Sequence, residues 1–209
     1  MPETHTKHRG RFLFSRHWFR PFTSQTVAAS MALSLLILAP GLAHATSISS
    51  QALWTSLDHS LHITTGPANY KRMIYVFFDP NCIYCHAFWK VANPVENSIH
   101  LDIRWVPVAF LKADSMAKDA AILMSQNSAQ AFEYNEEHFN DTAESGGIPG
   151  RATAPNALIH AVLANNEMLE TVLKNKGTPT IVYKLRGHVE IQRGLPDSQN
   201  AIYKILTGR

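Results

Sequence analysis

The stretch that decides the fold is residues 73–89, which read MIYVFFDPNCIYCHAFW. Its first six residues are apolar, aromatic or β-branched, a pattern typical of a strand buried on both faces of a sheet. Pro80 disfavours a helical conformation at Asp79, and Asn81 is a favourable N-cap residue. The stretch therefore predicts a buried strand over residues 73–78, a turn, and a helix that begins at Cys82.

Cys82 and Cys85 are the only cysteines of the chain, so its sulfur chemistry is confined to one helical turn. Residues three apart on a helix have Cβ atoms roughly 5–6 Å from each other. A disulfide joins Cα atoms about 4.4–6.8 Å apart, so this pair can close and open with little backbone movement. The spacing and the preceding strand indicate a dithiol redox centre.

The position of Cys82 at a helix start predicts a reactive thiolate. Unpaired backbone amides and the helix dipole favour an anion there, and cysteines in this setting have pKa values lowered from about 8.5 to roughly 3.5–7.5. We therefore expect Cys82 to be the nucleophile and Cys85, one turn deeper, to resolve the mixed disulfide. Ile83 and Tyr84 lie between them and are expected to tune both thiols. The redox-active pair itself is the only cofactor that we expect.

Haem attachment is the other interpretation of the cysteine pair that remains open from the residues alone. Residues 82–86 also match the C-x-x-C-H pattern of haem attachment, and the helix-spaced methionines Met116, Met124 and Met168 are candidate distal ligands. A c-type haem electron-transfer protein is therefore the alternative function. A zinc site needs four ligands, and the sequence offers no second C-x-x-C and no H-x(3–5)-H pair, so we expect no metal.

The first 45 residues have the pattern of a secretory signal peptide. Basic residues precede an uncharged stretch over residues 27–38, and Ala43 and Ala45 form a small-residue cleavage site. This leader carries 5 of the 19 basic and 1 of the 16 acidic side chains, which leaves 14 against 15 in the rest of the chain. Export predicts the oxidising periplasm, and the balanced charge gives no reason to expect nucleic-acid binding.

The other predicted elements form a mixed α/β sheet with a helical insertion. They are helices over residues 50–63, 115–125, 128–139 and 155–174, strands over residues 101–108, 180–185 and 188–192, and a last helix opening at residues 195–197. We therefore expect a linker helix in residues 46–70 and a domain over residues 71–209. The insertion occupies about residues 112–176.

Three details of these helices are also predicted. Pro94 is expected to kink or end the helix that carries the cysteines. Asn165 and Asn166 are expected to break the third inserted helix. The second inserted helix carries Glu133, Glu136 and Glu137 as a solvated acidic face.

Residues 75–89 resemble the active site of the DsbG/DsbC branch of periplasmic disulfide oxidoreductases, with the greater likeness to DsbG. Further matches are AAIL at residues 120–123, GTPT at 177–180 and GLPD at 194–197, all in consistent order. The resemblance implies a thioredoxin-like fold with a helical insertion. It also implies that Pro179 is cis and packed opposite Cys82. Thr178 would then line the substrate groove and present its backbone to an extended substrate segment.

The chain departs from this branch at three places. Its members carry an N-terminal dimerisation domain, whereas only seven residues separate the predicted cleavage site from Leu53. We therefore expect a monomer that lacks this domain, so the resemblance does not by itself imply the isomerase activity that depends on the dimer. A proline or glycine is usual at the position of Ile83, and a lysine at that of His86. Both changes are expected to shift the redox potential, of which 30 mV corresponds to ~1.4 kcal/mol for this couple.

Residues and resemblance together predict an exported thiol–disulfide oxidoreductase. It would exchange disulfides, or reduce sulfenic acids, in periplasmic proteins through the dithiol of Cys82 and Cys85. A membrane redox partner is expected to recycle the pair.

Overall fold

The computed structural model describes residues 48–209, so the predicted signal peptide over residues 1–45 lies outside the described residues. The elements, in chain order, are α1 (Ser50–Asp58), β1 (Ile63–Thr65), β2 (Arg72–Phe78), α2 (Ile83–Glu96), β3 (Leu101–Pro107), α3 (Ser115–Leu123), α4 (Ser128–Glu137), α5 (Asn156–Glu167), the π-helical turn η1 (Met168–Val172), β4 (Thr180–Leu185), β5 (His188–Arg193) and α6 (Gln199–Thr207). None of the helices among residues 48–209 is long and apolar enough to cross a membrane.

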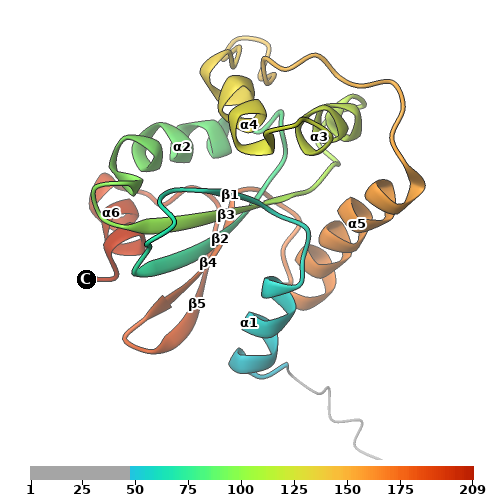
Figure 1. The fold of residues 1–209 in the computed structure, drawn as a ribbon. Helices are drawn as coiled ribbons and strands as arrows, with labels where there is room; N and C mark the ends of the chain where they lie inside the picture. Colours follow the sequence, from blue (N-terminus) through green and yellow to red (C-terminus); the bar gives the residue numbers. More distant parts are fainter. Residues whose placement is uncertain (1–47) are drawn as a thin grey trace, which may run out of the picture. The chain divides into compact units, whose positions relative to one another are not determined.

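The five strands form one mixed sheet in the order β1-β3-β2-β4-β5 (Figure 1). β2 runs parallel to β3, while the other neighbouring strands are antiparallel. In the register of the sheet, Phe78 lies opposite Pro107 on β3, and Phe77 lies opposite Thr180 on β4. The C-terminal ends of β2 and β3 and the start of β4 therefore lie at the same end of the sheet. The cysteine motif follows β2 at this end.

Helices cover both faces of the sheet, which explains the continuous apolar run of β2. Alternate residues of a strand point to opposite faces, so Ile74, Val76 and Phe78 pack against α2 and α6, together with residues of α3 and α4. Tyr75 and Phe77 point to the other face, where they pack with α1 and η1. Figure 1 shows α2 and α6 on one side of the sheet and α1 and α5 on the other. The prediction of a strand buried on both faces is confirmed.

The predicted linker helix is shorter than expected, and a strand follows it. α1 ends at Asp58, and the chain then extends into β1, where Ile63 pairs with Trp105 of β3. Residues 63–65 thus belong to the sheet, although we assigned them to a linker segment. A strand of three residues is too short to leave a periodic pattern, and its hydrogen bonds come from residues about forty positions away.

The paired asparagines do not break the third inserted helix. α5 runs through Asn165 and Asn166 and continues directly into η1. Both side chains point away from the helix backbone to neighbouring loops: Asn165 donates to the carbonyls of Leu61 and Pro107, and Asn166 exchanges two hydrogen bonds with the backbone of Ala109. The amides therefore join the helix to the loop that follows β3.

Several helix ends differ by a few residues from the predicted ones; α3 and α4, for example, end at Leu123 and Glu137, two residues earlier than predicted. Pro94 lies inside α2, which ends two residues later at Glu96. The last helix begins at Gln199, not at residues 195–197, because Ser198 is its N-cap and accepts a hydrogen bond from the backbone N–H of Ala201 at 3.2 Å.

Phe132 of α4 anchors the insertion to the sheet, and its loss is expected to be costly. The ring is fully buried, with its centroid 5.0 Å from that of Phe78 and 4.7 Å from that of Trp105. Phe132→Ala is expected to lower the free energy of unfolding by about 3–5 kcal/mol in urea titrations. Tyr134→Ala changes an exposed aromatic residue of the same helix and should cost less than ~1 kcal/mol. Equal losses in the two variants would contradict this view of the core.

Candidate active site

The sheet topology brings together Cys82 and Thr178, which are 96 residues apart in the sequence. Cys82 follows the end of β2, and Thr178 precedes the start of β4 at the same end of the sheet. In its thiol form, Sγ of Cys82 donates to the backbone carbonyl of Thr178 at 3.4 Å. The Thr178–Pro179 peptide bond is cis, and the carbonyl of Pro179 accepts the N–H of Gly194 at 2.8 Å.

Cys82 is the N-cap of α2 and not its first helical residue. Its backbone is extended, with φ −87° and ψ 107°, and the helix begins at Ile83. Sγ of Cys82 accepts the backbone N–H of Cys85 at 3.2 Å, as a capping oxygen would. Asn81, the predicted cap, directs its side chain elsewhere. The sulfur therefore occupies the position where free amides and the helix dipole favour negative charge.

The two thiols differ in the ease with which they ionise. A side-chain hydrogen bond with Cys85 lowers the pKa of Cys82, although partial burial acts against it. Backbone N–H groups of Cys85 and Tyr84 lower this pKa further. Burial raises the pKa of Cys85 well above the ordinary thiol value, and the hydrogen bond and negative charge of Cys82 raise it further. The first thiol therefore ionises more readily than the second.

The residues expected to tune the thiols lie in three different environments. Ile83 is half-buried, while the side chain of Tyr84 is 60% exposed between the two cysteines. His86 is buried, and its ring stacks on Phe139 with the centroids 4.5 Å apart. Only Tyr84 is therefore openly presented beside the thiols.

His86 meets a buried carboxylate from the insertion. Its Nδ1 lies 3.2 Å from Oε2 of Glu136, and its Nε2 lies 3.6 Å from a carboxylate oxygen of Asp141. The prediction of a solvated acidic face is wrong for Glu136, which is only 2% exposed. Burial raises the pKa of Glu136, while hydrogen bonds from His86 and Asn135 lower it. The sequence pattern of α4 could not show this partner, which lies fifty residues from His86 along the chain.

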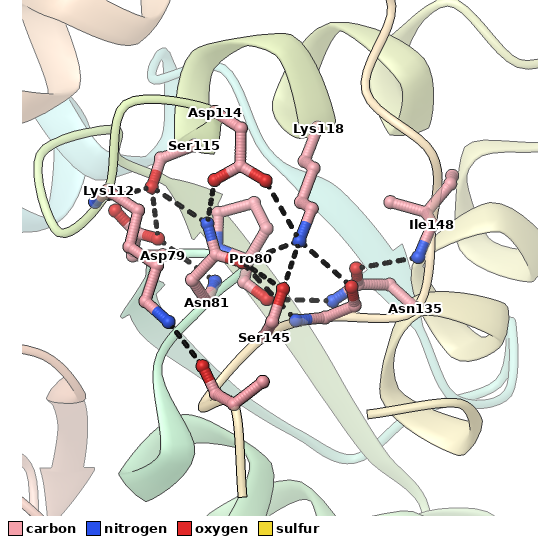
Figure 2. A network of polar contacts seen from close by, with 12 residues as sticks. Asp79, Pro80, Asn81, Lys112, Asp114, Ser115, Lys118, Asn135, Ser145 and Ile148 are labelled. Atoms are coloured by element: carbon pink, nitrogen blue, oxygen red, sulfur yellow. Dashed lines mark hydrogen bonds and ion pairs between the residues drawn. The ribbon is translucent and has the colours of Figure 1, made fainter. Parts of the chain in front are cut away.

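Residues of the insertion form hydrogen bonds with each residue of the loop between β2 and Cys82, which is Asp79, Pro80 and Asn81. The Asp79 carboxylate accepts from Ser115 Oγ at 2.8 Å and from the backbone N–H groups of Phe110 and Leu111. Asn135 Nδ2 donates to the carbonyl of Pro80 at 3.1 Å. Figure 2 shows that the side chain of Asn81 also points into this network. Sequence reasoning missed these residues because none of them carries a recognisable motif.

A second buried aspartate lies near this loop and should make folding stability depend on pH. Asp119 of α3 is fully buried, and neither carboxylate oxygen has a hydrogen-bond partner among residues 48–209. Burial raises the pKa of Asp119 well above its usual range, and the charge of Asp79 adds to the effect. A folded-state pKa above the unfolded-state value of about 3.9 means that the contribution to stability is complete below that pH and is lost as the pH rises through the folded-state pKa.

Asp119→Asn is therefore expected to be more stable than the wild type at neutral pH and to lose this part of the pH dependence. Urea titrations at several pH values from about 4 to 8 measure both effects. The exposed Asp197→Asn should leave the pH profile unchanged. A steep wild-type profile that persists in Asp119→Asn would contradict the assignment.

The fold and the arrangement of the site define the class of protein. A family model described as Thioredoxin_2, a thioredoxin-like domain, matches residues 61–206. The chain therefore belongs to the thioredoxin-like family, as the mixed sheet and the cysteine pair after its central strand β2 indicate.

Within this class, the chain is similar to two DsbG proteins. It is 30% identical over 148 residues to the thiol:disulfide interchange protein DsbG of Pseudomonas aeruginosa, and 31% identical over 153 residues to that of Escherichia coli K12. Each match covers 70% of this chain but only 56% and 58% of the relatives, so the chain spans little more than half of their length.

A solved structure shows the same fold at lower sequence identity. A periplasmic thioredoxin-like protein from Salmonella enterica serovar Typhimurium matches with a TM-score of 0.57 and 16% identity, over 78% of this chain and 99% of its own. At this identity the likeness concerns the fold alone.

Proposed function

We propose that this protein is a thiol–disulfide oxidoreductase in which Cys82 is the nucleophile and Cys85 the resolving thiol. The observation that carries the proposal is the cap of α2, where Sγ of Cys82 accepts a backbone N–H at 3.2 Å. An acceptor at a helix N-terminus is stabilised as an anion, and the thiolate is the form that attacks disulfides. The similarity to DsbG over 70% of the chain supports this activity.

The reaction begins with attack of the Cys82 thiolate on one sulfur of a substrate disulfide. A bond forms between Cys82 and the substrate, the substrate disulfide breaks, and its other sulfur leaves as a thiolate. Cys85 then loses its proton and attacks Sγ of Cys82, which releases the second substrate sulfur as a thiolate. The substrate gains two electrons and the cysteine pair loses two. A substrate sulfenic acid would follow the same course, with hydroxide leaving in the first step to form water.

Thr178 and Pro179 would hold the substrate next to the reacting sulfur. The carbonyl of Thr178 lies 3.4 Å from Sγ of Cys82, at the start of a strand. An extended peptide that carries the target sulfur could pair with backbone groups of the loop before β4, in the way that extended peptides pair with other backbone segments. The cis bond between Thr178 and Pro179 belongs to this substrate-binding loop.

The setting of this reaction would be the periplasm. The N-terminal signal pattern and the likeness to DsbG support export, and the predicted substrates are periplasmic protein thiols and disulfides. A membrane redox partner would return the pair to its working state.

The haem alternative fits the structure less well. In the C-x-x-C-H pattern the histidine ligates the iron. His86 is instead buried against Phe139, and its two ring nitrogens face Glu136 and Asp141. The arrangement of His86 therefore favours dithiol chemistry.

The intact mass of the protein purified from the periplasm tests the proposal. Incubation of the reduced protein with a disulfide-containing peptide should remove two hydrogens from its mass and release two peptide thiols. A covalently bound haem would instead add its own mass. An unchanged mass, with both thiols still free, would reject the proposed activity.

A further inference from the structure

Asn81 is a better capping residue than cysteine, yet it does not cap α2. Asparagine is among the preferred N-cap residues because its side-chain oxygen accepts the free N–H groups of the first turn. A helix starting one residue earlier would place Cys82 inside the first turn, and Sγ would then lose the N–H of Cys85. In this structure the cap falls on Cys82, so something must hold the Asn81 side chain away from the helix.

The amide oxygen of Asn81 is held by Lys118 of α3. Nζ of Lys118 lies 2.7 Å from Oδ1 of Asn81, and this oxygen also accepts from Ser145 Oγ and Gly146 N at 3.3 Å (Figure 2). Lys118 is only 5% exposed, and Nζ further contacts Ser145 Oγ at 2.7 Å and the Gly146 carbonyl at 2.9 Å. A buried ammonium group needs these acceptors, since it cannot turn to water. Its bond with Asn81 is therefore charge-assisted and hard to replace.

The amide nitrogen of Asn81 is held from the same helix. Nδ2 donates to Oδ1 of Asp114 at 3.0 Å and to Oγ of Ser115 at 3.1 Å. The other carboxylate oxygen of Asp114 lies 3.2 Å from Nζ of Lys118. Both ends of the Asn81 side chain are thus directed toward α3, and no part of it remains to cap α2.

We propose that Lys118 is a positioning residue: by holding the amide of Asn81, it keeps that residue out of the helix cap and leaves the position to the sulfur of Cys82. The inference rests on the proposed function, in which the Cys82 thiolate starts the reaction. It assigns to the helical insertion a task in the chemistry of the site. When Lys118 is removed, Asn81 loses the shortest and only charge-assisted bond to its amide oxygen, and that oxygen can then compete for the amides that stabilise the thiolate.

The rate at which iodoacetamide alkylates Cys82 in the reduced, full-length protein measures this directly, with the modified residue located by mass spectrometry. At about pH 6, Lys118→Met, which has no hydrogen-bond donor, is expected to react about tenfold more slowly than the wild type, which corresponds to a rise of one unit in the pKa of Cys82. Asn81→Ala, which has no competing cap, should react like the wild type. The double variant should match Asn81→Ala.

A direct effect of the Lys118 charge would give a different result. In that case Lys118→Met would slow alkylation equally with and without Asn81, and the proposal would be overturned. It would also be overturned if Lys118→Met reacted as fast as the wild type. A wild-type Cys82 that does not react as a thiolate at this pH would instead reject the proposed function itself.

Asp114, whose side chain is half exposed, provides a second test that leaves Lys118 in place. Asp114→Ala removes an acceptor of the Asn81 amide, whereas Asp114→Asn keeps an oxygen there and removes only the charge. We expect Asp114→Ala to react more slowly than Asp114→Asn. If Lys118 acted through its charge, the loss of its counterion would speed alkylation equally in both variants, which would refute a role for Asn81.

Discussion

Cys82→Ser is expected to lower the rate of disulfide exchange by at least about a thousandfold. A serine hydroxyl at this position keeps the cap of α2, since it can accept the same backbone N–H, but it does not ionise near neutral pH and is a poor nucleophile toward sulfur. The variant therefore removes the chemistry and leaves the local fold. The reduction of insulin by dithiothreitol, followed by turbidity, and exchange with a disulfide-containing peptide both measure the loss.

The control for this prediction is the stability of the variant. Cys82→Ser should unfold at a urea concentration close to that of the reduced wild type, because the capping hydrogen bond is preserved. A variant that is folded and still retains more than about a tenth of the activity would show that another group starts the reaction.

Cys85→Ser is expected to stop the reaction halfway and to accumulate covalent complexes with substrates. The Cys82 thiolate can still attack, but the thiol that releases the substrate is missing, so the mixed disulfide persists. The hydroxyl at position 85 cannot displace a sulfur. Non-reducing gels of periplasmic extracts should show bands that disappear on addition of a reductant.

A double variant, Cys82→Ser with Cys85→Ser, is the matched control and should form no such bands. The prediction concerns one specific bond, and peptide mapping should place each substrate on Cys82. Substrates attached elsewhere, or an absence of adducts from a Cys85→Ser protein that binds its substrates, would contradict the assigned order of the two thiols.

The fold and the cysteine pair could be predicted from the sequence because their signals are local. β2 follows from six consecutive apolar residues, and the redox pair follows from two cysteines three residues apart. β4 and β5 were also predicted closely, as strands over residues 180–185 and 188–192. Thr178 and Pro179 came instead from a family resemblance, since an isolated threonine–proline pair gives no indication that it lies next to a cysteine 96 residues away.

The supports of the site could not be predicted, because each depends on a partner far along the chain. Asn81 has the local properties of an N-cap residue, yet its side-chain oxygen accepts a hydrogen bond from Lys118, 37 residues later in the chain. Glu136 has the pattern of a solvated residue, yet its carboxylate is enclosed against His86. The local preference of a residue for a helix cap is a weak guide where a buried charge requires acceptors. An unsatisfied hydrogen-bonding group in the interior costs more free energy than the exchange of one capping residue for another.

The most direct measurement is a pH titration of the Cys82 thiolate by its ultraviolet absorbance in the reduced protein, with Cys82→Ser as the reference. The arrangement at the N-terminus of α2 predicts a midpoint below the ordinary thiol value of about 8.5, with Cys85 ionising only at a higher pH. A thiol at position 82 that stays protonated up to that ordinary value or beyond would contradict a nucleophile stabilised by the helix cap.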